Sequence, residues 1–203
     1  MSVVATVAGA PIAVDEVDAR EARLRSGRRA ATLPASGTSE GRQLRRWLTQ
    51  LIVTERVVAT EAAARGLGPR DAPTEAELLP DTTARLEIGS VAAAALADPR
   101  ARALFAEITA AVEVTDDDVA DYHARNPLRF ASPSTGPHGW RSPADVGPPL
   151  DEARSAITEH LLGVARRRAF RVWLDARRDA LVELARGYEH PGDPRQPDNT
   201  HRH

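Results

Sequence analysis

Apolar residues recur at helical spacing over much of the chain, and the clearest pattern lies in its first half. There they fall three, four or seven positions apart, which places them on one face of a helix. The stripe consists of Leu44, Trp47, Leu48, Leu51, Ile52, Val58 and Ala62. Gly66 follows as a typical helix-ending residue. We expect this helix to be the centre of the core.

The N-terminal residues show the alternation of a strand. Val3 to Val7 alternate in this way, and Gly9-Ala10-Pro11 is a turn signal. Ile12 and Val14 either extend a hairpin or lead into a helix capped by Asp15. A second short strand is predicted at 112–114, where two valines flank Glu113, and it is expected to pair with the first.

Helix starts are marked by capping residues in the middle of the chain. Asp81 precedes one apolar segment, and Asp98-Pro99 precedes another. Thr115 with Asp118 three residues later resembles a capping box. The acids at 116–118 are therefore predicted to complement a helix dipole in preference to holding a hard cation.

Residues 151–186 predict one long helix. Apolar residues recur along one side of it, namely Ile157, Leu161, Val164, Val172, Ala176, Ala180 and Leu184. At about 1.5 Å per residue the helix reaches roughly 50 Å, which exceeds what a small domain covers. Phe170, Trp173 and Leu174 widen its apolar surface. We expect it to contact other elements on two sides, or a partner.

Composition narrows the possible functions. The 203 residues, 42% hydrophobic and 28% charged, suit one sizeable core. A net charge of -2 gives no general attraction for nucleic acid, which is not expected as a partner. No stretch approaches the roughly 20 apolar residues that span a bilayer, so no membrane association is expected. The start lacks a secretory signal pattern, which favours a cytoplasmic location.

Two residue types are missing, and each absence removes a class of chemistry. The sequence has no cysteine, which excludes thiol catalysis and thiolate metal sites. It also has no lysine, so all 27 basic residues are arginines and no Schiff base can form on a lysine.

Three segments, in this order, resemble the SurA/PrsA-like family of parvulin-associated chaperones. The segments are Val7–Ile12, similar to the family's opening strand and turn; Leu48–Gly66, similar to its core helix; and Val114–Val119 followed by Tyr122, Asn126-Pro127 and Phe130. In the family the third segment leads into a peptidyl-prolyl isomerase domain. Residues 131–150 are far too few for that domain, so the resemblance implies the scaffold without the isomerase.

The resemblance implies a mainly α fold similar to the SurA N-terminal helical bundle, with a long C-terminal helix and two short β-strands. It divides the chain into an N-terminal helical part (1–130), a Pro/Gly-rich bridge in place of the isomerase domain (131–150), the long helix returning onto the N-terminal part (151–187) and a Pro/His-rich tail (188–203). Family members cradle unfolded polypeptide in the helical part.

Our first functional hypothesis is therefore a non-catalytic, chaperone-like module that binds a peptide or protein client in an apolar groove. Trp140, in the bridge, and Phe170, on the long helix, are the predicted groove contacts. Trp140 plugging the groove is the other interpretation of that residue. This hypothesis requires no cofactor, and the client stays unidentified.

The alternative is a metal-dependent enzyme or accessory protein that uses the C-terminal histidines. In an extended backbone His201 and His203 project to the same side, and His190 would complete a Zn or Cu site. A solvated tail without a ligand is the simpler interpretation of the same residues. A third hypothesis is a homodimer in which a second copy covers the long helix.

Overall fold

The protein is mainly helical, with a long C-terminal helix and a small three-stranded sheet, which confirms this part of the predicted fold. A computed structural model describes residues 2–28, 30–70, 72–131, 134–135, 141–142 and 147–189. Its strands are β1 (Val3–Val7), β2 (Ala10–Ala13), β3 (Ser134–Thr135), β4 (Arg141–Ser142) and β5 (Val182–Leu184). Its α-helices are α1 (Val14–Arg25), α2 (Ser39–Ala64), α3 (Glu75–Leu78), α4 (Thr82–Ile88), α5 (Ser90–Ala95), α6 (Pro99–Ile108), α7 (Asp116–Arg125) and α8 (Leu150–Leu181), with a 3-10 turn at Ala30–Thr32.

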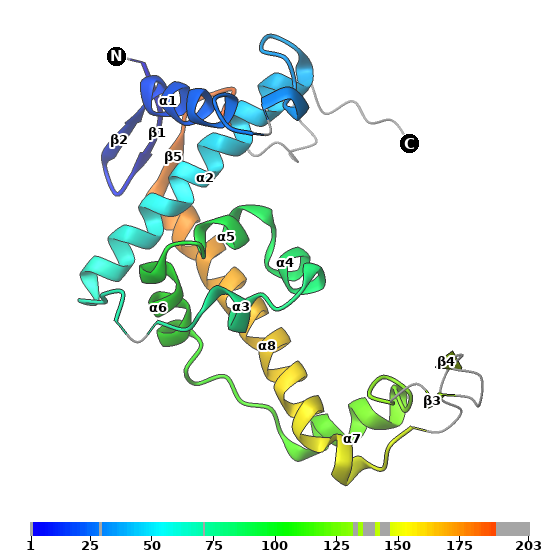
Figure 1. Cartoon of the computed structure of the whole chain (residues 1–203). Coiled ribbons are helices and arrows are strands. Elements are labelled where there is room, and N and C mark those ends of the chain that lie inside the picture. Colours follow the sequence, from blue (N-terminus) through cyan, green and yellow to red (C-terminus); the bar gives the residue numbers. More distant parts are fainter. Residues whose placement is uncertain are drawn as a thin grey trace.

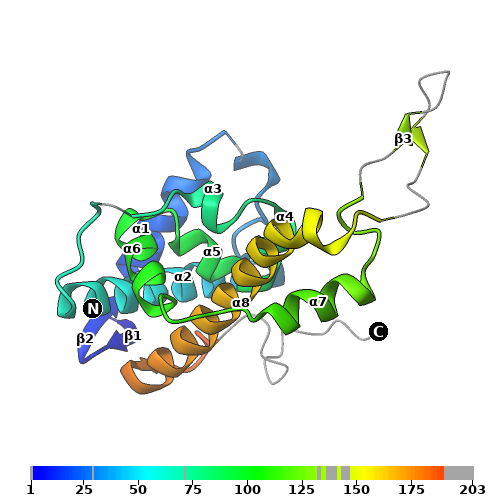
Figure 2. The same cartoon turned by 90° about the horizontal axis from the view of Figure 1, so that it is seen from below.

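Helix α8 runs through the length of the molecule and connects its two ends (Figure 1). The sheet and α1 lie at one end, and α7 lies at the other. Between them α8 packs against α2, α4 and α6. Viewed from below, α7 lies beside the first half of α8 (Figure 2), and these two helices are in contact.

The sheet joins the two ends of the described chain. Its strand order is β2-β1-β5, with both neighbours antiparallel to β1. Ala8 and Gly9 connect β1 to β2 and both have positive φ, as two-residue hairpin loops require. The predicted strand at 112–114 is wrong, because these residues form an extended connection and β5 takes the place beside β1.

Helix α2 is the central core helix, as its stripe predicts. Thr38 Oγ1 accepts the Gly41 amide at 3.0 Å at its start, and Gly66 with φ +67° follows its end. Leu48 is fully buried on it. From α6 and α8, Phe105 and Phe170 join the same core, and their ring centroids lie 5.0 Å apart.

Most of the predicted caps are present. Asp81 and Asp98 accept backbone amides at the starts of α4 and α6. Thr115 and Asp118 form the capping box of α7, with Thr115 Oγ1 accepting the Asp118 amide at 3.1 Å. The exception is α1, which begins one residue before Asp15. There Glu16 Oε1 accepts the Ala13 amide at 3.2 Å instead.

The residues just before α8 lie against α7 and the turn that follows it. Gly147 packs so tightly on Pro127 that a Cβ atom there would lie 1.7 Å from the Pro127 carbonyl oxygen. His123 Nε2 lies 2.8 Å from the carbonyl oxygen of Pro148. Inside the bridge, β3 pairs with β4. These contacts hold the start of α8 beside the end of α7.

Candidate functional site

The candidate site is a groove on the part of α8 that the other helices leave uncovered. Toward its C-terminal end, α8 buries Phe170 and Leu174 in the main core. Near its N-terminal end it buries Ala153 and Ile157 in a second, smaller cluster with Val119 of α7. Between these two clusters, one side of α8 is not covered by any other described helix and forms the floor of a groove.

We call this feature the α7–α8 groove, and its volume is about 740 Å³. Its walls come from the connection before α7 (Glu113, Val114) and from one face of α7 (Asp118, Tyr122, Arg125), and its floor from α8 (Leu161, Val164, Ala165, Arg168, Ala169, Val172, Trp173, Ala176). The volume falls within the range of about 300–1,000 Å³ that is usual for ligand sites.

The floor is an apolar strip at helical spacing. Val172 is 61% exposed, and Leu161 and Ala169 are partly exposed. An exposed valine within a largely apolar surface is unfavourable in water unless a ligand or partner covers it. Ala165 and Ala169 are small, so the backbone of a ligand can approach α8 closely at this level.

Charged groups stand around and within the strip. The Asp118 carboxylate accepts the hydroxyl of Thr115 at 2.6 Å and its amide at 3.0 Å, and these bonds lower the pKa of Asp118. It is therefore committed to capping α7. Arg125 donates from Nε to the carbonyl oxygen of Asp121 at 3.1 Å. Arg168 is exposed on the floor and has no hydrogen bond or ion pair with any other described residue.

Behind the groove, three rings join α7, α8 and the turn after α7. The centroid of Tyr122, which lines the groove, lies 5.4 Å from that of His160 and 6.3 Å from that of Phe130. His160 faces a second cavity between α4 and α8. Burial lowers the pKa of His160 below 6.5, and the charge of Arg129 lowers it further. The neutral imidazole is thus the form that suits this ring cluster.

Acidification is expected to destabilise the protein through His160. Because the pKa of His160 is lower in the folded state, the unfolded chain binds the proton first as pH falls below about 6.5. The stability contributed by the neutral ring is present above that pH and is lost progressively below it. We expect the free energy of unfolding to fall less between about pH 7.5 and about pH 5.5 in His160→Phe than in wild type.

Urea unfolding at the two pH values measures this difference. Phenylalanine keeps a ring beside Tyr122 and cannot titrate, so the comparison isolates protonation. The charges of Glu87 and Asp81 raise the pKa of His160, whereas those of Arg129 and Arg167 lower it. An identical pH dependence in both proteins would show that these acids offset the effect.

The predicted site residues fall in different places. Phe170 is 1% exposed and packs against Phe105 and Trp173, so its predicted role as a groove contact is corrected to a core role. Trp173, which widens the apolar surface of the long helix in the sequence, packs against the core and also lines the groove. Trp140 lies outside the described residues. The predicted metal ligands, His190, His201 and His203, also lie outside the described residues.

The metal hypothesis therefore stays a prediction. Among the described residues, no group of three or more histidine or acidic side chains is arranged to hold a metal ion. Sequence reasoning did not single out Arg168 as a groove residue, and it treated Tyr122 only as part of a resemblance. The sequence signal for this groove is the width of the apolar surface on α8. One partner helix cannot cover a surface that wide.

One family match was found, and it lies away from the groove. The model of a family of unknown function, DUF7158, matches residues 3–40, which hold β1, β2, α1 and the connection to α2. No curated protein matches the chain, and no solved structure does. No helix in the described ranges has an apolar stretch long enough to cross a bilayer.

Proposed function

We propose that this protein is a non-catalytic, chaperone-like module that binds a segment of a partner protein in the α7–α8 groove. The observation that carries the proposal is the exposed apolar strip on α8, centred on Val172. Covering such a strip removes apolar surface from water, at roughly 25 cal/mol per Å². A cytoplasmic location, as the sequence predicts, accompanies this proposal.

The lining chemistry favours binding over catalysis. The described groove residues are aliphatic, aromatic, arginine or acidic side chains, and none forms a nucleophile–base pair. Strip residues recur at three- and four-residue spacing, as in Leu161, Ala165, Ala169, Val172 and Ala176. That spacing suits an amphipathic helix lying along α8, a common way of recognising peptides.

The test is a pair of matched substitutions. Val172→Asp places a carboxylate in the middle of the strip, where a bound segment would bury it without a partner, and we expect it to weaken binding by about tenfold or more. Leu86→Asp is the control, because Leu86 on α4 is 76% exposed and lies outside the groove. Both sites are exposed, so both variants should fold.

Two measurements apply to both variants. Suppression of aggregation of a chemically unfolded reporter protein reports chaperone activity, and anisotropy of a labelled amphipathic peptide reports affinity. Wild type and Leu86→Asp should behave alike, while Val172→Asp should lose both activities. Equal activity in all three proteins would exclude the groove as the binding site.

A further inference from the structure

Arg168 interrupts the apolar strip between two of its valines. Val164 and Val172 lie one helical turn before and after it, and all three line the groove. Any ligand that covers both valines must also cover the position of Arg168. This inference rests on the proposed function, because it requires that a segment of a partner protein binds in the groove.

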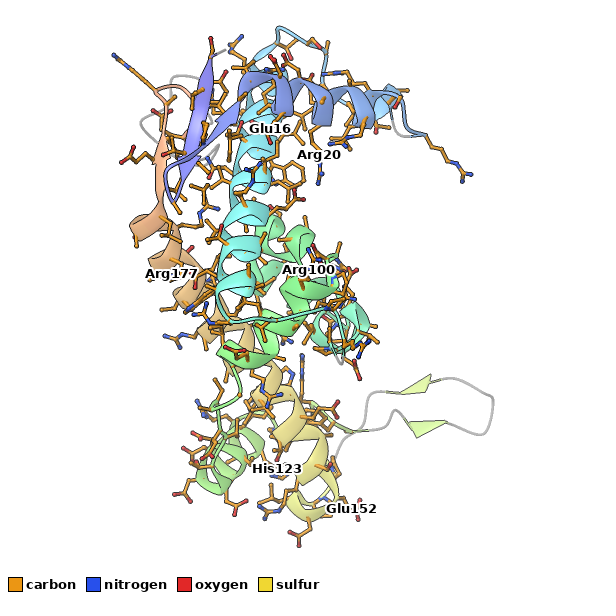
Figure 3. The ribbon with its side chains drawn as sticks, turned by 90° about the vertical axis from the view of Figure 1, so that its left-hand side faces the viewer. Glu16, Arg20, Arg100, His123, Glu152 and Arg177 are labelled. Carbon is orange, nitrogen blue, oxygen red and sulfur yellow. The ribbon has the colours of Figure 1, made fainter. Side chains whose placement is uncertain are left out.

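Three arginines of α8 pair with carboxylates, and two others, Arg171 and Arg178, donate to uncharged oxygens. Arg154 pairs with Asp116 at 2.8 Å, and Arg167 pairs with Glu87 at 2.8 Å. Arg177 reaches Glu61 of α2, with its Nε 2.9 Å from Oε1, at the side of α8 shown in Figure 3. Arg168 has no carboxylate partner within the described chain, so its positive charge is uncompensated there.

The charged groups of the groove differ in how they are held. Arg125 is bonded only to a backbone carbonyl of its own helix, so its charge is also uncompensated by any described carboxylate. Asp118 is held by Thr115, which leaves Glu113 as the acid of the groove without a described partner. Asp118 keeps its charge, so the groove lining carries two acids and two arginines. Arg168 is the cation on the apolar floor, and an acidic group of a ligand complements it there better than a basic one.

Binding would remove water from Arg168, and a buried guanidinium is costly unless a hydrogen-bonded acid accompanies it. A carboxylate is the natural partner because it can accept two parallel N–H donors from one guanidinium. We propose that the partner segment is an amphipathic helix whose apolar face carries a carboxylate that pairs with Arg168. Arg168 is then the residue that selects acidic segments over other apolar ones.

The experiment uses three designed helical peptides of about 15 residues, a length that matches the strip at about 1.5 Å per residue. They share an apolar face and differ at one central position, which is Glu, Gln or Lys. We expect wild type to bind them in the order Glu, Gln, Lys, with about tenfold between the first and the last. In Arg168→Glu the order should invert.

The controls separate this inference from the proposed function. Arg100→Glu makes the same change of charge on α6. Figure 3 shows Arg100 away from His123 of α7, so this variant should keep the wild-type order. Equal affinities of wild type for all three peptides, or an unchanged order in Arg168→Glu, would reject the role of Arg168 and leave the groove as a binding site. Failure of every peptide to bind would reject both.

A second copy of this chain is the competing occupant. Analytical ultracentrifugation at the concentrations of the binding assay tests it. We expect a monomer for wild type and for Val172→Asp. A wild-type dimer that Val172→Asp dissociates would assign the groove to self-association and overturn the proposal.

Discussion

Replacing Phe170 with alanine is expected to lower the free energy of unfolding by about 3–5 kcal/mol. The Phe170 ring is 1% exposed and lies between Phe105 and Trp173, with centroid separations of 5.0 Å and 5.4 Å. Its removal leaves a cavity where α8 meets α6, and rigid helices on both sides limit how far the cavity can collapse. For a domain with a total stability of about 5–15 kcal/mol, this is a large fraction.

Urea unfolding followed by circular dichroism measures the loss, and Val172→Ala is the matched control. Val172 lies two residues further on the same helix but is 61% exposed, so its truncation should change the free energy of unfolding by less than about 0.5 kcal/mol. The peptide affinities should show the reverse order, with Val172→Ala weakened more than Phe170→Ala under conditions where both are folded. A stable Phe170→Ala protein with lost affinity would restore Phe170 to the groove.

The sequence predicted the helices with strong caps and stripes and missed the strand that closes the sheet. The alternation around Glu113 spans only three residues, and an extended connection produces the same pattern as a strand. At β5 a strand was predicted as helix. Ala180 and Leu184 continue the four-residue spacing of α8, so the sequence pattern does not show that the helix ends and a strand begins at Val182. Which short segment pairs with β1 depends on tertiary placement, and local pattern does not carry that information.

The candidate site was predictable only in outline. The length of the last helix and its wide apolar surface indicate that part of it stays uncovered, and the structure has such a part. Phe170 and Val172 are two residues apart and equally apolar in the sequence, yet one is in the core and the other in the groove. The approach of α4 and α6 on one side of α8 decides between them. Residue type alone therefore could not identify the groove contacts.

Replacing Glu61 with glutamine is expected to destabilise the helical body. It is 4% exposed on α2 and accepts hydrogen bonds from Arg177 of α8, at 2.9 Å from Nε, and from Arg65. Glu61→Gln removes the charge and leaves two arginines facing a neutral amide. We expect a loss of about 2–3 kcal/mol in the free energy of unfolding, less than for a fully buried pair because both arginines keep some exposure to water.

The pH dependence of this loss identifies its cause. Burial raises the pKa of Glu61, but the bonds and charges of Arg65 and Arg177 outweigh burial and lower it below 4.5. The contribution of its charge is therefore present above about pH 4.5 and disappears as pH falls through the lowered pKa, so wild type and Glu61→Gln should converge in acid. Glu107→Gln removes the exposed partner of Arg65, 3.3 Å from its Nε, and should cost less than about 0.5 kcal/mol. A Glu61→Gln deficit that persists unchanged in acid would mean that the amide disturbs packing, and that the ion pairs between α2 and α8 contribute little to stability.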